Sequence, residues 1–172
     1  MGEINKCLKE WNATVEALGQ GKQTIIIRTY KTNLEEFLLY PTVSYTLKDN
    51  YLERYQMKHR SFVGENALPK KENDRTEIKY YVQLEKIIEY SNLRIGDFRY
   101  FYIWTPEHIK SYLGGQKAYI WVLRVYKLDE PHMAEPNPRA GKYANLKGDV
   151  SLEGIMPVLS DDEFLNIVKG MD

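Results

Sequence analysis

The chain has 172 residues, enough to bury one sizeable core, and we expect a single domain over residues 1–172. Its 24 Lys and Arg residues balance its 24 Asp and Glu residues, which excludes a strongly basic protein, so an anionic partner would need a local patch of charge. Hydrophobic residues make up 43% of the chain and aromatic residues 13%, which excludes a disordered or fibrous protein.

The first part of the chain favours a helix followed by a β-hairpin. Apolar residues over 4–18 recur at spacings of three, four and seven, which predicts a helix ending at Gly19. The β-branched run 24–30 and the run 36–40 predict two strands, and Pro41 ends the second.

The middle of the chain predicts helical turns, a loop and a long strand. We expect short helical turns over 49–58 and a polar surface loop over 64–74. Residues 77–85 alternate between apolar and polar, which is typical of a half-exposed strand in an antiparallel sheet. The alternation slips at 86–88, where we expect a bulge or the end of the strand.

The last part of the chain carries clear helix signals. Thr105 and Pro106 have the side chains of an N-cap and a first helical residue, and Gly114 suits the helix end. The segment 130–141 has three prolines and no apolar period, so we expect an irregular connection. Residues 160–163 form a capping box that predicts a final helix.

This order of elements predicts an α+β fold. The connections are too uneven for a doubly wound parallel sheet. We expect a mixed, mainly antiparallel sheet, with a barrel-like form as one arrangement, flanked by an N-terminal and a C-terminal helix.

The sequence lacks the usual patterns of disulfide-bonded, membrane-spanning, metal-binding and nucleotide-binding proteins. Cys7 is the sole cysteine, and no run approaches 18 apolar residues, so we expect a cytoplasmic protein without membrane association. The three histidines His59, His108 and His132 lie in separate segments without metal-ligand spacing. No phosphate loop, dinucleotide glycine pattern or nucleophile elbow occurs. We therefore expect no metal and no cofactor.

One catalytic pattern remains open. Glu77 and Lys79 lie on one face of the expected strand, the arrangement in which restriction-type nucleases hold Mg²⁺ and stabilise developing charge. Asp49 or Asp74 would supply the second acid. The alternative is that these are alternating charges on the exposed side of a strand.

Basic and aromatic residues near the ends of the expected elements form a candidate nucleic-acid-binding surface, because arginine contacts phosphates or base edges and flat rings stack on bases. The candidates are Arg28, Tyr30, Tyr40, Thr42, Trp104, His108, Arg124, Tyr126 and Lys142. The two arginines interrupt apolar strands, so each needs a partner. Glu36 and Asp129 are possible mates in structural salt bridges. A binding pocket instead requires Arg28, Arg124 and an aromatic ring around one concavity.

A family resemblance runs through the same residues. It rests on Glu10-Trp11, Gly21-x-Gln23, Arg28, the run from Glu36 to Thr42, Ile103-Trp104-Thr105, Leu123-Arg124-Val-Tyr126-x-Leu128 and Pro131. In this order they resemble the domain of unknown function 1802 family. Some members look associated with restriction-endonuclease domains, which implies a role in restriction-modification or another DNA-linked system. The layout is also similar to PUA-like modules, pseudo-barrels that bind RNA or modified bases.

The chain departs from the family pattern at three places. Tyr102 replaces a usual histidine, Ser44-Tyr45 replaces a His-Gln pair, and 141–145 lacks a usual cysteine. These losses favour a binding role over an enzymatic one. The sequence thus predicts a module that binds DNA or RNA, with a Mg²⁺-dependent nuclease component or an interaction or scaffold protein with a protein partner as alternatives. Its oligomeric state stays open.

Overall fold

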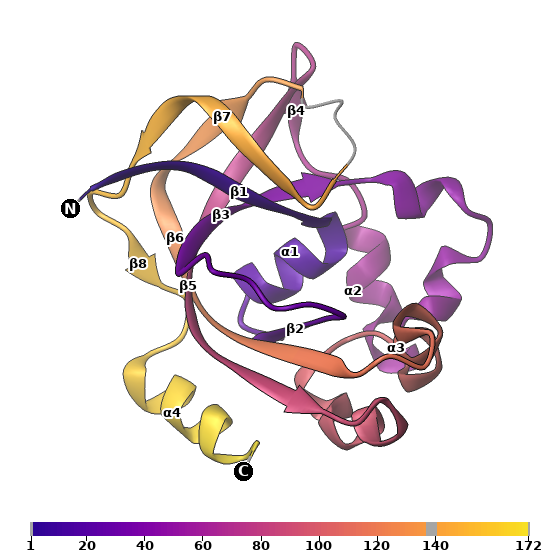
Figure 1. Ribbon diagram of the computed structural model, residues 1–172. Helices are drawn as coiled ribbons and strands as arrows, with labels where there is room; N and C mark the ends of the chain where they lie inside the picture. Colours follow the sequence, from indigo (N-terminus) through magenta and orange to yellow (C-terminus); the bar gives the residue numbers. More distant parts are fainter. Residues whose placement is uncertain (1, 137–140, 172) are drawn as a thin grey trace.

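The computed structural model describes residues 2–136 and 141–171, which form one curved, eight-stranded sheet with helices around it (Figure 1). The main path of the sheet is β2 (Ile25–Arg28), β6 (Ala118–Ala134), β5 (Arg75–Tyr90), β3 (Glu36–Thr42), β1 (Glu3–Trp11) and β7 (Tyr143–Ser151). Two short strands lie off this path: β4 (Lys71–Glu72) pairs with β5, and β8 (Met156–Pro157) pairs with β6.

The expected α+β class with a mixed, mainly antiparallel sheet is confirmed. Only β1 and β3 run parallel, and every other pair of strands in the described residues is antiparallel. The path ends at β2 on one side and β7 on the other, so the sheet curves but stays open. Helix α1 (Asn12–Gly19) lies inside this curve (Figure 1).

The predicted N-terminal helix over 4–18 is wrong for its first half. Residues Glu3–Trp11 form β1, and the helix begins only at Asn12. The strand lies between β3 and β7, and it buries Cys7 and Leu8, which are neighbours on opposite faces. A strand buried on both faces has no period-two pattern, so its apolar spacing resembled that of a helix.

The predicted hairpin of 24–30 with 36–40 is also wrong. Strand β2 pairs with β6, whereas β3 lies between β1 and β5. Pro41 does not end β3 but lies inside it, opposite Glu10 of β1. Two strands adjacent in sequence are therefore separated by β6 and β5 in the sheet.

Strands β5 and β6 form the long central ribbon of the sheet. The slip predicted at 86–88 is confirmed, because the register shifts between Leu84 and Lys86. A second shift lies between Ile78 and Tyr80, and these side chains belong to different core clusters. The irregular connection expected from 130 is wrong for its start, since β6 continues to Ala134, and residues 137–140 lie outside the described part.

The helix signals near the C-terminus are confirmed. In α3 (Pro106–Leu113), the backbone N–H of His108 donates to Thr105 Oγ1, and Gly114 takes the left-handed conformation at the end. In α4 (Asp161–Lys169), Ser160 and Glu163 form the capping box. None of the helices in the described part of the chain has the length and apolar character needed to cross a bilayer.

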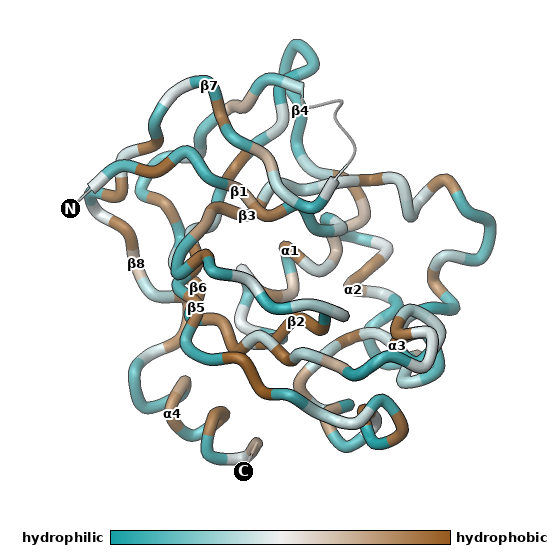
Figure 2. Tube along the Cα trace, viewed as in Figure 1, coloured by the Kyte–Doolittle hydropathy of each residue, from teal (hydrophilic) through white to brown (hydrophobic). Residues whose placement is uncertain are grey.

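The remaining elements gather on one side of the sheet, around α3 (Figure 1). They are α2 (Arg60–Glu65) and the 3₁₀ segments η1 (Ser44–Leu47), η2 (Tyr51–Arg54), η3 (Met57–His59) and η4 (Asn92–Phe101). These turns agree with the helical turns expected over 49–58, while the expected loop over 64–74 contains β4. The strands supply most of two core clusters, and the helices and 3₁₀ segments supply the largest share of the third, while hydrophilic residues dominate the outer loops (Figure 2).

Candidate functional site

A pocket of about 460 Å³ opens where β1, β2 and β3 end beside α3. We call it the aromatic pocket. Its lining residues are Lys9, Glu10, Trp11, Ile27, Arg28, Tyr30, Thr42, Ser44, Trp104, His108, Ile109, Tyr112, Gly141 and Lys142. Among the residues predicted from the sequence, Arg28, Tyr30, Thr42, Trp104, His108 and Lys142 thus lie around one concavity.

Trp11 forms the centre of a stack of rings on one wall. Its ring lies 5.0 Å from Tyr45 at an interplanar angle of 17°, and 5.5 Å from His108 at 33°. The Arg54 guanidinium carbon lies 5.7 Å from the centre of the Trp11 ring. Trp11 is half-buried and Tyr45 is buried, so the stack is fixed from behind while part of the indole faces the pocket.

An ion pair forms the polar part of the pocket wall. Arg28 Nη2 donates to Glu10 Oε2, and its Nη1 donates to the carbonyl oxygen of Ile27 at 3.1 Å. The other carboxylate oxygen of Glu10 accepts the backbone N–H of Trp11 at 2.8 Å. The side chains of Arg28 and Glu10 are 11% and 7% exposed. Arg28 therefore forms a structural salt bridge, as one alternative from the sequence held, but its partner is neither Glu36 nor Asp129.

Burial and charge act in opposite directions on Arg28. Burial would lower its pKa, but the Glu10 carboxylate favours the charged form, and the pKa of Arg28 is raised above its usual value. Arg28 therefore stays a cation that is already neutralised locally. Arg28 can therefore donate hydrogen bonds to a ligand, but its positive charge is already balanced by Glu10.

Lys142 and Tyr30 form the opposite rim of the pocket. The Lys142 ammonium lies 3.5 Å from the centre of the Tyr30 ring. Burial raises the pKa of Tyr30 to about 12, although Arg28 opposes that rise. The Tyr30 hydroxyl thus stays protonated at neutral pH. Lys142 is exposed at the pocket mouth, where its charge is available to an anion.

Arg124 and Tyr126 lie away from the aromatic pocket. Arg124 Nη2 donates to the Leu159 carbonyl oxygen and to Asp161 Oδ1, both at 2.9 Å, and its guanidinium lies 4.9 Å from the Phe164 ring. Arg124 thus fixes the start of α4, and it pairs with neither Glu36 nor Asp129, the two mates suggested from the sequence. The predicted pocket with Arg28, Arg124 and an aromatic ring around one concavity is therefore wrong, since Arg124 does not line the aromatic pocket.

Tyr40 lies on the wall of a different hollow. Its hydroxyl donates to the carbonyl oxygen of Glu135 at 3.1 Å, and its ring is buried between β3 and the end of β6. Of the nine residues predicted for binding, Tyr40, Arg124 and Tyr126 therefore do not line the aromatic pocket.

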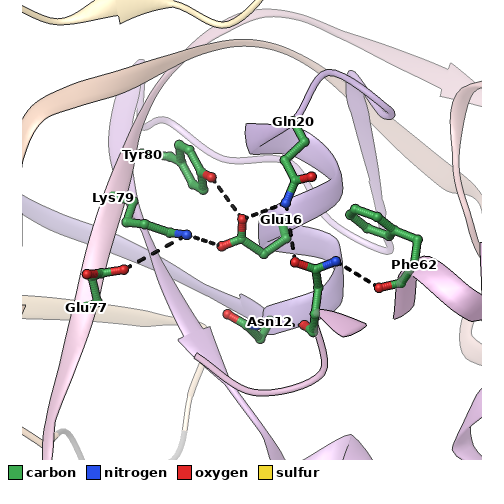
Figure 3. A network of polar contacts seen from close by, with 8 residues as sticks. Asn12, Glu16, Gln20, Phe62, Glu77, Lys79 and Tyr80 are labelled. Carbon is green, nitrogen blue, oxygen red and sulfur yellow. Dashed lines mark hydrogen bonds and ion pairs between the residues drawn. The ribbon is translucent and has the colours of Figure 1, made fainter. Parts of the chain in front are cut away.

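Glu77 and Lys79 belong to a polar network that joins β5 to α1 (Figure 3). Lys79 Nζ lies 2.6 Å from Glu16 Oε2 and 3.9 Å from Glu77 Oε1. Glu16 also accepts from the Tyr80 hydroxyl at 2.9 Å and from Gln20 Nε2 at 3.1 Å. The lysine ammonium thus contacts both acids.

This arrangement differs from the one expected for a nuclease. The acid that shares Lys79 with Glu77 is Glu16, whereas Asp49 and Asp74 are exposed in connecting segments. Among residues 2–136 and 141–171, no three His, Cys, Asp or Glu side chains are grouped as metal ligands. The network ties α1 to the sheet.

His108 is held in its neutral form by its surroundings. Burial lowers its pKa below the usual 6.5, the Arg54 charge lowers it further, and Glu10 opposes both. At neutral pH the ring next to Trp11 is therefore an uncharged imidazole. It provides a flat face to the pocket and no positive charge.

We expect His108 to make the fold less stable in mild acid. The unfolded chain binds this proton at a higher pH than the folded protein does, so the stability contribution is complete above the unfolded pKa of 6.5 and is lost as pH falls from there through the lower pKa of the folded protein. Denaturant titrations at pH 7.5 and pH 5 should show a smaller pH-dependent loss for His108→Phe than for the wild type. Burial also lowers the pKa of His59, so His59 contributes to the same pH-dependent loss of stability, and the variant His59→Asn measures that share. An unchanged slope in His108→Phe would contradict this assignment.

The structure adds pocket residues that the site prediction omitted, chiefly Glu10, Trp11, Ser44 and Tyr112. Glu10 and Trp11 were assigned to the face of a helix, and that error hid them. The end of β1 instead brings both side chains to the pocket. The signal that could have found them was the Glu10-Trp11 pair in the family pattern.

Comparison with solved structures supports the same architecture. The ASCH protein from Zymomonas mobilis has a TM-score of 0.51 at 13% identity, with 95% of this chain and 93% of that chain covered. A serine-to-alanine mutant of that protein also has a TM-score of 0.51, at 12% identity, with 95% and 94% covered. ASCH domains have a PUA-like fold, so the PUA-like architecture expected from the sequence is confirmed.

Comparison at the level of sequence gives the family. No curated protein matches the chain. The model of the domain of unknown function DUF1802 matches residues 7–169, which include most of β1, the aromatic pocket and α4. The chain therefore belongs to the DUF1802 family.

Proposed function

We propose that this protein binds nucleic acid and holds one unstacked base in the aromatic pocket. The observation that carries the proposal is the convergence of Trp11, His108 and Tyr30 with Arg28 and Lys142 around a single concavity of about 460 Å³. Pockets of a few hundred Å³ with aromatic walls and a few polar groups are the usual form of small-ligand sites. A flat, polar and anionic ligand fits this lining.

The aromatic wall would bind the face of the base. Trp11 is held in place by Tyr45 and His108, so little side-chain freedom is lost when a base packs against the part of the indole that lines the pocket. Stacking of a base on an aromatic side chain contributes about 1–3 kcal/mol and tolerates any base. Trp11 is thus the residue on which affinity should depend most.

The charged residues divide into two roles. Arg28 and Glu10 neutralise each other, so together they present N–H donors and carboxylate acceptors to a base edge. Lys142 on one rim and Arg54 beside Trp11 form no ion pair within the described residues, and they are suited to contact phosphates. Base contact and backbone contact would therefore come from different side chains.

The PUA-like fold and the family membership are compatible with this proposal and do not name the ligand. We propose recognition of RNA or of a modified base, or a part in a restriction-modification system, as the settings in which the pocket acts. Nothing in the described residues favours the nuclease alternative, because Lys79 joins Glu77 to Glu16 and not to Asp49 or Asp74.

The first test is the substitution Trp11→Ala. We expect it to weaken binding about 5- to 150-fold, the equivalent of about 1–3 kcal/mol of stacking energy. Fluorescence anisotropy with labelled single-stranded RNA, single-stranded DNA, duplexes and modified strands at several salt concentrations measures this. Trp11→Phe should recover part of the affinity because a ring is retained.

Tyr126→Ala is the matched control, since this half-buried ring of β6 lies outside the aromatic pocket. Circular dichroism must show that Trp11→Ala remains folded, because Trp11 also packs on Tyr45. Absence of salt-sensitive binding by the wild-type protein to every strand would refute the proposal. Cleavage of the strands with Mg²⁺, abolished by Glu77→Gln, would favour the nuclease alternative instead.

A further inference from the structure

An exposed tyrosine lies between two cations at the junction of η3 and η4. Tyr100 is 70% exposed. Arg99 lies 4.7 Å and Lys58 5.6 Å from the centre of its ring. We call Lys58, Arg99 and Tyr100 the Tyr100 platform. A large exposed ring with two adjacent cations is the composition of a single-strand binding surface.

The two cations of the platform, Lys58 and Arg99, form no direct ion pair in the described residues. The nearby Asp97 is paired instead with Arg94, at 3.2 Å. Asp97 also interacts electrostatically with Arg99 beyond ion-pair distance, so the charge of Arg99 is only partly compensated.

Hydrogen bonds hold the platform in a fixed position relative to the aromatic pocket. Gln56 Nε2 lies 2.9 Å from each of the carbonyl oxygens of Arg99, Tyr102 and Trp104, which share its two N–H donors. The segment 99–104 is therefore fixed against the turn between η2 and η3. Trp104 lines the aromatic pocket, and Tyr100 lies four residues before it.

The distance between the two surfaces suits a short strand. Four residues span at most about 14 Å, and stacked nucleotides are spaced by about 3.4 Å. A few nucleotides thus reach from the pocket to the platform. Arg54 joins the pocket wall to the segment that carries Tyr100, because its guanidinium approaches Trp11 and its carbonyl oxygen accepts the N–H of Thr105 at 2.8 Å.

We infer that the Tyr100 platform is a second subsite for single-stranded nucleic acid. This inference rests on the proposed function of the aromatic pocket. The strand whose base fills the pocket continues past Arg54, a later base stacks on Tyr100, and Lys58 and Arg99 move from the ring to the flanking phosphates. Both side chains are exposed, and the movement of Arg99 breaks its hydrogen bonds to the Gly96 carbonyl oxygen at 3.0 Å and to the Tyr100 hydroxyl at 3.3 Å. The ligand is then a strand of several nucleotides and not a free nucleotide.

A length series tests this inference. Binding of a mononucleotide and of a six-nucleotide strand is measured for the wild type, Tyr100→Ala and Trp11→Ala, in RNA and DNA arms. We expect Tyr100→Ala to weaken binding of the six-nucleotide strand about 5- to 150-fold and to leave mononucleotide binding unchanged. Trp11→Ala should weaken both.

The charge of the platform is tested by salt dependence. The double variant Lys58→Ala with Arg99→Ala should reduce the slope of log affinity against log salt by about 0.7 for each phosphate that the platform no longer neutralises. Arg94→Ala is the matched control, because Arg94 belongs to the same 3₁₀ segment and also lies over a ring, that of Tyr90, but is paired with Asp97. Its slope should stay that of the wild type.

The outcomes separate the two proposals. If the six-nucleotide strand loses affinity with Trp11→Ala but not with Tyr100→Ala, the platform inference is overturned and the pocket stands. The same holds if the six-nucleotide strand binds no more tightly than the mononucleotide. If the wild type binds neither ligand, the proposed function fails and the inference fails with it.

Discussion

Replacing Arg28 with methionine is expected to lower the free energy of unfolding by about 3–5 kcal/mol, because it leaves the buried Glu10 carboxylate without its partner. Methionine keeps much of the side-chain volume, so the loss reports on charge more than on packing. Urea unfolding monitored by tryptophan fluorescence measures the change.

Removing the other charge should reverse most of this loss. In the double variant Arg28→Met with Glu10→Gln, the amide oxygen still accepts the Trp11 N–H and no uncompensated charge remains. Arg75→Met is the matched control: its ion pair with Glu135 has half-exposed side chains, and its loss should cost at most about 1 kcal/mol. Equal losses at both sites would show that burial of the Glu10 pair is not what stabilises it.

The helix ends could be predicted from sequence because their determinants lie within a few residues of one another. At α3, the Thr105 side chain accepts an unpaired backbone N–H, Pro106 has no N–H to leave unpaired, and Gly114 adopts the left-handed conformation that ends the helix. At α4, Ser160 and Glu163 pair the first backbone N–H groups in a capping box. Such signals do not depend on the rest of the fold. They were correct for that reason.

Strand β1 could not be predicted in the same way because its pattern depends on its neighbours. It lies between a parallel and an antiparallel partner, so Cys7 and Leu8 are both buried although they point to opposite faces. Local spacing then carries no strand signal. The same cause explains Pro41, whose place within β3 follows from pairing with β1 and not from the local preference of proline to end a strand.

The sequence predicted the kinds of residue in the candidate site better than it predicted which individual residues would meet there. Arginines within apolar strands correctly indicated that each needs a partner, but the partners lie 18 and 37 residues away, at Glu10 and Asp161. Long-range pairing follows from sheet order, which the sequence did not reveal. Because of this sheet order, Arg28 lies in the aromatic pocket and is paired with Glu10, whereas Arg124 lies at the start of α4 and is paired with Asp161.

Substituting Gly19 by alanine is expected to cost about 3 kcal/mol, because a Cβ at this position would overlap the ring atoms Cζ, Cε1 and Cε2 of Tyr80. That ring cannot easily move. It is 4% exposed, and its hydroxyl donates to Glu16 in the network that joins α1 to β5. Chemical denaturation of Gly19→Ala measures the loss, and Gly64→Ala is the control, since a Cβ there meets nothing within 4 Å and should stabilise α2 by up to about 1 kcal/mol.

A double-mutant cycle identifies the ring as the cause. In a Tyr80→Phe background the ring remains, so Gly19→Ala should stay as costly as in the wild type. In a Tyr80→Ala background, itself destabilised by about 3–5 kcal/mol, the overlap disappears and Gly19→Ala should become neutral or stabilising, since alanine favours a helix over glycine. If Gly19→Ala still lowers the free energy of unfolding without the ring, glycine is required at this position by the backbone conformation at the end of α1. A penalty that vanishes with the ring would show that the absence of a side chain at Gly19 is what allows α1 to pack closely against β5, beside Glu16 and Lys79.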